Sequence, residues 1–522
     1  MSTIALGPAA AAPSSALQPL RGFNLALLTL GLSLGTFIEV LDVTVANVAV
    51  PTIAGSLGVS NSQGTWVISS YSVAGAIVVP LTGWLARRVG EVRLFLLSVL
   101  LFTIASMLCG LAPSFHALVA LRIVQGLVSG PMMSLSQTIL VRSFPETQRN
   151  LAIALWAMTL VIAPILGPVV GGWIIDTYSW PWIFYINLPI GLFSFASCAI
   201  LLKGRETPIE KPPIDTIGIG LLIFGVGALQ MMLDLGRDRA WFQSSFIVTL
   251  AIIAFVCIGF LLIWESYEKH PAIDLSLFRE RTFASCVAVA SLGMMVFSAV
   301  AVIFPLWLQT LMGYTAEQAG LATAPVGLLT LVFSLLIAKN MSRLDLRLLS
   351  SFGFCVFAGV LFWNSHFTLD MSFGQVILPR FVQGLGVACF FIPLTTATLS
   401  RVPSHRLADA SSLSNFMRNM FAAFGTTISV TVWDNRATYH HAVLSESVTH
   451  ASAATRHYLD VLHAGGIGSG RDLALMDQLV TQQAYMIATN EVFYVCGALC
   501  LVLAVMIWFA RPPSGVTASI GH

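Results

Sequence analysis

The chain of 522 residues is 57% hydrophobic and only 10% charged. Soluble globular proteins carry about 25% charged residues, so this composition excludes a soluble enzyme or binding module and indicates an α-helical protein that crosses a membrane many times. The net charge of +2 says little about partners, and no nucleic-acid partner is expected.

The first 20 residues are rich in Ala, Pro and Ser. A secretory signal needs a basic stretch before its apolar core, and this segment carries no charge before Arg21. We expect residues 1–22 to form a disordered cytoplasmic tail, and the first apolar run to remain in the protein as an uncleaved span.

Runs of about 20 apolar residues, long enough to cross a bilayer as helices, follow along the chain. Fourteen runs are expected to be spans: 23–50, 64–85, 92–111, 114–140, 151–175, 182–202, 216–235, 244–265, 282–310, 317–338, 348–366, 371–399, 408–432 and 488–510. With the N-terminus inside, eighteen of the 26 Lys and Arg residues fall on the cytoplasmic face. The positive-inside rule therefore predicts an even number of spans and two cytoplasmic termini.

The first span contains two charged residues between Phe23 and Val50, Glu39 and Asp42. A spacing of three places them about 60° apart on a helix, so they share one face. A charge at the centre of a membrane helix costs about 2.5–3.5 kcal/mol, and counting back from Pro51 puts Asp42 about 14 Å below the outer helix end. Both are candidate proton-coupling residues; the alternative is a solvated interfacial carboxylate, and it weighs more for Glu39. Asn47 is a candidate substrate-binding residue.

Spans two and three are joined by a tight basic hairpin that begins at Gly83. Gly83 allows close helix approach, Gly90 makes the turn, and Arg87, Arg88 and Arg93 hold the loop at the cytoplasmic face. We treat this hairpin as a conformational motif, with topology orientation alone as the alternative.

Span four contains Arg122, about 12 Å inside the outer end of the helix when counted at 1.5 Å per residue. A lone Arg at this depth is costly, so a carboxylate or carbonyl partner is needed. Asp42 or Glu39 is the expected partner, which makes Arg122 a third candidate for proton coupling. Gln125 is a candidate substrate-binding residue.

The chain also repeats itself. Arg122-Ile-Val-Gln-Gly-Leu recurs as Arg380-Phe-Val-Gln-Gly-Leu, and each copy precedes a similar entry into the next span, at 149–154 and 405–410. Internal repeats around a central site are a transporter architecture. The expected units are an N-terminal six-helix bundle at 23–205, two additional helices at 206–270 and a C-terminal six-helix bundle at 271–522.

Span five carries a run of prolines and glycines: Pro164, Gly167, Pro168, Gly171 and Gly172. Pro168 removes a backbone donor and bends the helix. The three glycines leave a flat face on which another helix can approach closely. We interpret the run as a conformational motif, with a purely structural kink as the alternative.

The second half carries further polar groups inside its spans. Candidate substrate-binding residues are Gln383, Phe391, Asn415 and Arg418. Glu491 is either a second titrating group or an interfacial residue. Residues 433–487 are polar and contain five His, and we expect a long periplasmic loop with some helix. Docking of another protein is the functional alternative, because loops of this length are often functional.

Enzyme signatures are missing from the sequence: no GxxxxGK[ST], HExxH or GxSxG run is present, and no CxxC pair. We therefore expect a protein that is not an enzyme and needs no nucleotide, metal or cofactor. Its energy source is then an ion gradient, in which one charge moving across 100 mV is worth about 2.3 kcal/mol.

Several stretches together resemble the EmrB-type multidrug exporters, fourteen-span drug:proton antiporters of the major facilitator superfamily. They are 41–51, 63–67, 83–95, 182–191 and 391–396, and the run 163–172 resembles the motif of the superfamily's antiporters, as opposed to its symporters. The sequence departs from the family pattern at Arg87, where an Asp is usual, and at Glu39, where an uncharged polar residue is common. The first departure puts a charge relay through the hairpin in doubt, and the second puts the substrate range in doubt.

This resemblance implies an all-α membrane protein with the major facilitator fold, two six-helix bundles plus two extra helices, working by alternating access. It implies a proton gradient as driving force, Asp42 as proton acceptor, and export of hydrophobic or amphipathic drugs across the bacterial inner membrane. It also implies a tripartite pump with a periplasmic adaptor and an outer-membrane channel, with 433–487 as the docking segment. Export of fatty acids or another amphipathic metabolite, a proton-coupled uptake symporter and a non-transporting scaffold remain alternatives.

Overall fold

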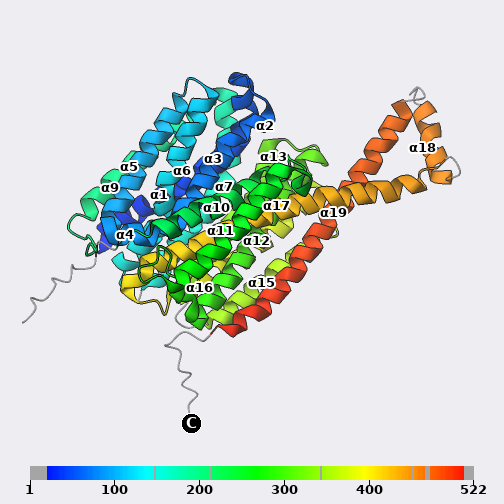
Figure 1. The fold of residues 1–522 in the computed structure, drawn as a ribbon. Helices are drawn as coiled ribbons and strands as arrows, with labels where there is room; N and C mark the ends of the chain where they lie inside the picture. The colour runs from blue at the N-terminus through cyan, green and yellow to red at the C-terminus, as the bar shows by residue number, and fades with distance from the viewer. Residues whose placement is uncertain are drawn as a thin grey trace, which may run out of the picture.

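The computed structural model describes residues 20–145, 148–210, 213–340, 344–449, 452–464 and 471–510, and within these ranges every regular element is a helix. Figure 1 shows the helices of the first half, in blue and cyan, beside those of the second half, in green to red. Residues 1–19 of the expected tail lie outside the described ranges.

The first half supplies a helical segment for each of the six expected spans. They are α1 (Gly22–Ser56), α3 (Trp66–Val78) continued by η1 (Val79–Leu81) and α4 (Thr82–Val89), α5 (Glu91–Gly110), α6 (Phe115–Ser143), α7 (Arg149–Thr177), and α8 (Trp182–Tyr185) with α9 (Asn187–Leu201); the short α2 (Asn61–Gly64) follows α1. Because α1 continues through Pro51 to Ser56, Asp42 lies about 21 Å from its outer end rather than the 14 Å expected. The acid is therefore near the middle of its helix.

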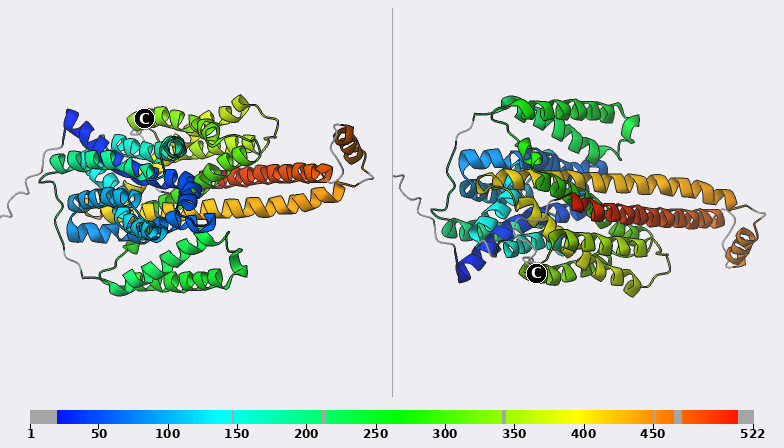
Figure 2. Two further views of the ribbon diagram at one scale, coloured as in Figure 1. Left: turned by 90° about the horizontal axis from the view of Figure 1, so that it is seen from above. Right: turned by 90° about the horizontal axis from the view of Figure 1, so that it is seen from below.

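Two extra helices follow the first half, α10 (Thr216–Leu235) and α11 (Ser245–Tyr267). In both views of Figure 2 this pair lies at the edge of the molecule. Helix α10 contacts α3 of the first half and α17 of the second. The pair therefore sits beside the line where the two halves meet.

The second half contains the remaining six expected spans. They are α12 (Arg281–Thr310), α13 (Ala316–Thr323) with α14 (Pro325–Asn340), α15 (Leu346–Asn364), α16 (Phe373–Leu399), α17 (Leu407–Ser447) and α19 (Arg471–Met506), with α18 (Ala453–Ala464) between the last two. Short 3₁₀ turns lie at Trp241–Gln243, Leu275–Arg279, Ser404–Arg406 and Ile507–Phe509.

Twelve helices in the described ranges are long and apolar enough to cross a membrane, and the bent α7 makes a thirteenth. The remaining expected span, 408–432, lies in α17, whose apolar stretch is interrupted by Arg418 and neighbouring polar residues. Because α17 contacts α6, α12 and α19, we place it within the bundle on the ground of its packing.

Segment 433–487 differs from the loop expected for it. Helix α17 continues to Ser447 and α19 begins at Arg471, so most described residues of this segment are helical. Figure 2 shows the two helices leaving the bundle together, and in Figure 1 they cross near the bundle and separate toward α18 at the tip. The segment is a projecting helical hairpin, because two long helices pack on each other beyond the apolar spans.

The helix α7 bends by 41° between Leu151–Pro164 and Leu166–Thr177. Pro168 has no N–H to donate to the carbonyl four residues earlier, so the break falls one turn before it, at 164–166. We call the end of the bundle that holds the 82–93 hairpin and the start of α17 the inner end, and the opposite end, from which α18 projects, the outer end.

Candidate functional site

The centre of the first half holds an ion pair between Asp42 of α1 and Arg122 of α6. Asp42 is 3% exposed and Arg122 0%, so neither group is solvated by bulk water. Removing two charges from water costs several kcal/mol for each ion, and only good geometry with further hydrogen bonds repays this cost. The pairing agrees with the expectation from depth, and it selects Asp42 over Glu39 as the partner.

Two neutral side chains complete the coordination of the acid, and a third holds one of them. Asn187 Nδ2 at the start of α9 donates to Asp42 Oδ1 at 2.9 Å, and Gln125 Nε2 donates to the same oxygen at 3.2 Å. Ser106 of α5 accepts from Asn187 at 3.0 Å and donates to the Phe184 carbonyl at 2.9 Å. The carboxylate on α1 is therefore held by groups from α6 and α9, and Ser106 of α5 fixes the α9 group in place.

The guanidinium of Arg122 is held from its other side by α3. Its Nε donates to the Val67 carbonyl at 2.9 Å, its Nη1 donates to Gln125 Oε1 at 2.8 Å, and its centre lies 4.3 Å from the Tyr71 ring centroid. Cation–π contacts of desolvated cations are worth about 2 kcal/mol. Arg122 is thus fixed in place whether or not Asp42 carries its charge.

Two members of this cluster, Asn187 and Ser106, have no assigned role in the sequence analysis. Asn187 lies in the stretch 182–191, which carries part of the resemblance, and it is a polar residue before an apolar run. That signal could have marked it as a buried hydrogen-bonding group. Ser106 gives no comparable signal, because small hydroxyl residues are common in membrane helices.

Glu39 lies one helical turn before Asp42, near the contact of α1 with α6. In the described part of the chain it forms no ion pair, and its Oε2 is buried without a hydrogen-bond partner. One turn further back, the hydroxyls of Thr36 and Ser136 are 2.5 Å apart. Glu39 therefore stands beside the pair and outside its hydrogen-bond network.

The repeat counterpart of this cluster in the second half lacks an acid. Arg380 of α16 donates to Gln383, as Arg122 does to Gln125, but its guanidinium faces the Phe304 ring of α12 at 3.0 Å from the centroid. Its Nε and Nη2 have no hydrogen-bond partner in the described residues. Phe304 thus lies where an acid would be needed for a second pair.

A third buried cation, Arg418 of α17, lies where the two halves meet. It donates to Asn415 and, at 3.2 Å, to Thr395 Oγ1, and it lies 5.4 Å from the Phe391 ring centroid. Asn415 donates across the interface to Ser134 and Gln137 of α6, at 3.2 and 3.3 Å. The structure thus groups three of the expected substrate-binding residues, Arg418, Asn415 and Phe391, in one cluster.

The other expected site residues lie elsewhere. Gln125 and Gln383 are hydrogen-bonded to the two buried arginines of the repeats. Asn47 is exposed, on a different side of α1 from Asp42. Glu491 of α19 pairs with Arg436 and His440 in the second half, at 2.6 and 3.0 Å, and not with the Asp42–Arg122 pair.

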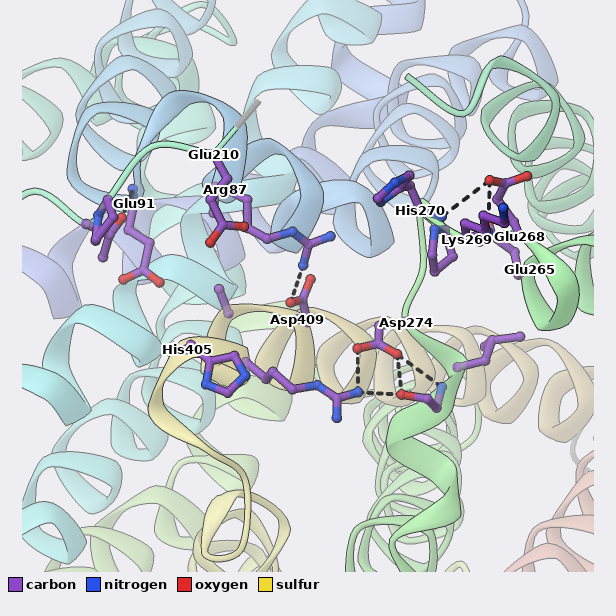
Figure 3. Close-up of a pocket in the computed structure, with 18 of the residues that line it drawn as sticks. Arg87, Glu91, Glu210, Glu265, Glu268, Lys269, His270, Asp274, His405 and Asp409 are labelled. Atoms are coloured by element: carbon purple, nitrogen blue, oxygen red, sulfur yellow. Dashed lines mark hydrogen bonds and ion pairs between the residues drawn. The ribbon is translucent and has the colours of Figure 1, made fainter. Parts of the chain in front are cut away.

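At the inner end, an ion pair joins the two halves. Figure 3 shows Arg87 of α4 pointing toward Asp409, in the first turn of α17. A Cβ on Gly83 would lie 2.7 Å from the Asp409 Cα, so only glycine lets α4 and α17 come this close. The family pattern has an acid at position 87, and this chain has an arginine there. The acid that pairs with this arginine, Asp409, belongs to the other half.

Neighbouring residues stiffen the same hairpin. Gly90 has φ +98°, which allows the sharp entry into α5. Glu206 accepts hydrogen bonds from the first backbone amides of α5, at Val92 and Arg93, at 3.0 and 2.9 Å. Arg88 lies 5.5 Å from the Trp84 ring centroid. These contacts fix Arg87 at the end of a rigid helix.

The glycines of α7 pack against α1. A Cβ on Gly167 would lie 2.0 Å from Thr44 Oγ1, and one on Gly171 would lie 3.1 Å from Val45. The expectation for Gly172 is wrong, because a Cβ there would meet nothing within 4 Å. Two glycines, rather than three, let α7 approach the helix that carries Asp42.

Comparison with known proteins gives one family and several relatives. The Major Facilitator Superfamily model matches residues 32–426. The chain is 48% identical over 495 residues to the fatty acid resistance protein FarB of Neisseria gonorrhoeae, and 46% identical over 500 residues to the multidrug export protein EmrB of Escherichia coli. Each match covers 95% of this chain and 98% of the relative.

Solved structures show the same fold at low sequence identity. The proton:xylose symporter XylE is 15% identical, with a TM-score of 0.60 over 94% of this chain and 97% of that one. A human organic anion transporter is 13% identical, with a TM-score of 0.57 over 93% and 100%. At these identities the likeness concerns the fold alone.

Proposed function

The chain belongs to the major facilitator superfamily and, within it, to the EmrB-type drug exporters, and we propose that it exports hydrophobic or amphipathic toxic compounds across the bacterial inner membrane. Relatives of nearly equal length, 46–48% identical, are named for multidrug export and fatty acid resistance. The observation that carries the mechanism is the wholly buried Asp42–Arg122 pair.

The export is driven by protons that bind Asp42. When the carboxylate takes up a proton, its charge is lost and Arg122 remains buried without a counter-ion, a change that costs about 3–5 kcal/mol. A charge crossing 100 mV supplies about 2.3 kcal/mol, which is of similar size. Proton binding can therefore shift α1 relative to α6, and a potential of 100 mV supplies a large part of the energy involved.

The inner end is the gate that this shift operates. In the present structure the Arg87–Asp409 pair and the Gly83 contact hold the two halves together there. Alternating access requires that the inner end open for loading and close for release. The Arg87–Asp409 link joins α4 of the first half to α17 of the second, so it must break in every cycle.

The cluster around Arg418 is the proposed substrate site. It offers a buried cation, the rings of Phe391 and Trp156 at 5.4 and 5.7 Å from the guanidinium, and amide and hydroxyl groups of both halves. No carboxylate pairs with Arg418 in the residues described. An apolar compound with a negative head, such as a fatty acid, is complementary to this arrangement.

The projecting hairpin of α17, α18 and α19 is the proposed docking segment for a periplasmic adaptor, which in turn would reach an outer-membrane channel. Its reach beyond the bundle supports this assignment (Figure 1). An uptake symporter is the remaining alternative, and the names of the 46–48% identical relatives argue against it because they refer to export and resistance.

The proposal is tested in a host that lacks its own pumps. Expression should raise the inhibitory concentrations of several hydrophobic drugs and of long-chain fatty acids, and everted vesicles with an acid interior should accumulate a fluorescent drug. An acid interior that drives no accumulation, together with unchanged susceptibility, would show that the chain is not a proton-driven exporter.

A further inference from the structure

The second half contains a groove of about 650 Å³ that the export mechanism does not use. It lies between α12, α17 and α19, with the end of α15 at its rim. Its apolar walls include Ile428, Val432, Val495 and Leu499, which are 42–56% exposed. In a protein that spans a membrane, such side chains face lipid, so the groove opens to the bilayer.

The depth of the groove matches one leaflet. Its floor is at Gly425, where a Cβ would lie 2.1 Å from the Met295 carbonyl and where α12 and α17 therefore touch. Its rim is at Arg436, eleven residues later on the same helix, or about 16 Å along the axis. The hydrocarbon core of one leaflet is about 15 Å thick, half of the bilayer core.

The rim carries both signs of charge at the depth of the lipid headgroups. Arg436 Nε and Nη2 donate to the two oxygens of Glu491 at 2.6 and 2.7 Å, and His440 Nε2 lies 3.0 Å from Glu491 Oε1. Among the described residues, Nη1 is left as a spare donor. Asn490 Nδ2 donates to the Phe367 carbonyl at 3.0 Å, and its Oδ1 is buried with no partner in the described residues. That oxygen is closed off from the groove, so the groups free at its mouth are the spare donor of Arg436 and the carboxylate of Glu491, whose side chain is 35% exposed.

We propose that this groove binds an acyl chain of an outer-leaflet phospholipid whose headgroup carries both a phosphate and a primary ammonium, as in phosphatidylethanolamine. The acyl chain lies along α17 and α19, the phosphate accepts from Arg436 Nη1, and the ammonium donates to the partly exposed carboxylate of Glu491. A purely anionic head fits less well, because Glu491 already neutralises Arg436 and repels a second negative group. The site is separate from the substrate cluster and does not depend on what is exported.

Native mass spectrometry of the purified full-length transporter tests this site. Phosphatidylethanolamine, phosphatidylglycerol with the same acyl chains, and palmitate are added in equal amounts. The test variants Val495→Trp and Leu499→Trp fill the groove from lipid-facing positions. Val505→Trp is the matched control, because Val505 is 67% exposed on the same helix but outside the groove.

We expect the wild type to retain one phosphatidylethanolamine in preference to phosphatidylglycerol. Each groove-filling variant should weaken this retention by about tenfold, equivalent to 1.4 kcal/mol, while Val505→Trp leaves it unchanged. Glu491→Gln should narrow the preference between the two headgroups. All variants must elute as single peaks and melt near the wild-type temperature.

Three results would overturn the proposal. Equal retention of phosphatidylethanolamine and phosphatidylglycerol would show that the site does not recognise the ammonium of the headgroup. Displacement of the phospholipid by palmitate at equal concentration would assign the groove to a single-chain amphiphile instead. Unchanged retention in both groove-filling variants would show that the lipid binds elsewhere on the protein.

Discussion

Replacing Asp42 by Asn tests the coupling mechanism most directly, because it keeps the shape of the side chain and removes its charge. The amide can still accept from Asn187, but it supplies one acceptor in place of two and no counter-ion for Arg122, which is fully buried. Removing one partner of a buried pair costs about 3–5 kcal/mol. Protein domains are stable by about 5–15 kcal/mol, so the variant should fold with a clearly lowered melting temperature.

The transport defect of this variant should be separable from its loss of stability. Adding Arg122→Gln to Asp42→Asn removes the uncompensated charge, and replacing both partners of a buried pair is often neutral, so the double variant should regain most of the lost stability. It should not regain coupling, because no group at position 42 can take up a proton. Asp234→Asn is a matched control, since Asp234 is a carboxylate of α10 that accepts from Gln230 at 3.0 Å, away from Arg122.

The assay is drug accumulation in everted vesicles with an imposed acid interior, alongside melting curves of the purified protein. Asp42→Asn and the double variant should show no accumulation above vesicles without transporter, whereas Asp234→Asn should resemble the wild type. Full proton-driven accumulation by Asp42→Asn would refute the role of Asp42. Restored accumulation in the double variant would show that the pair serves stability alone.

Three further predictions concern the gate, the α1–α7 contact and the substrate cluster. Arg87→Gln and Asp409→Asn should each lower resistance in a susceptibility assay by removing a charge-assisted bond worth about 1.5–3 kcal/mol, and the double variant should be no worse than either single one; additive losses would mean that the two residues act separately. Gly167→Val should cost about 1–3 kcal/mol by overpacking, measured as a lowered melting temperature, because its Cβ would lie 2.0 Å from a side-chain oxygen of α1, whereas Gly172→Val meets open space and should be neutral. Arg418→Gln should reduce resistance to long-chain fatty acids about tenfold, the equivalent of 1.4 kcal/mol, and leave resistance to an uncharged drug within about twofold; equal losses for both compounds would argue against a carboxylate-binding role.

The Asp42–Arg122 pair could be predicted from the sequence because burial in lipid leaves few options. Each charge lies well inside an apolar run, about 12–14 Å from its outer end, and each needs a partner at a similar depth. Helix length at 1.5 Å per residue was enough to match them, even though α1 extends further than expected. The same reasoning could not find Asn187, because its place depends on how α9 is rotated toward α1.

Contacts between distant parts of the chain could not be predicted from the sequence for a similar reason, because they depend on how the helices pack. Arg87 and Asp409 are 322 residues apart, and only the assembled bundle brings α4 against α17. The hairpin at 433–487 was expected as a loop because its mean polarity is high, yet a polar segment can be helical when two such helices pack on each other. The rotation of α7 decides which of its glycines face α1, and sequence spacing alone did not exclude Gly172.

The two repeat arginines show why a single proton site is the simplest mechanism for this fold. Arg122 and Arg380 each donate to a glutamine three residues later, but only Arg122 faces a carboxylate, whereas Arg380 faces the Phe304 ring. A cation over a ring is stabilised by about 2 kcal/mol when desolvated, and that contact does not change with protonation. In the proposed mechanism the second half therefore keeps its buried charge through the cycle, and the ion pair that a proton would break lies in the first half. Since the halves meet at Arg87–Asp409 and around Arg418, a change that begins at Asp42 in one half can reach both the gate and the substrate cluster.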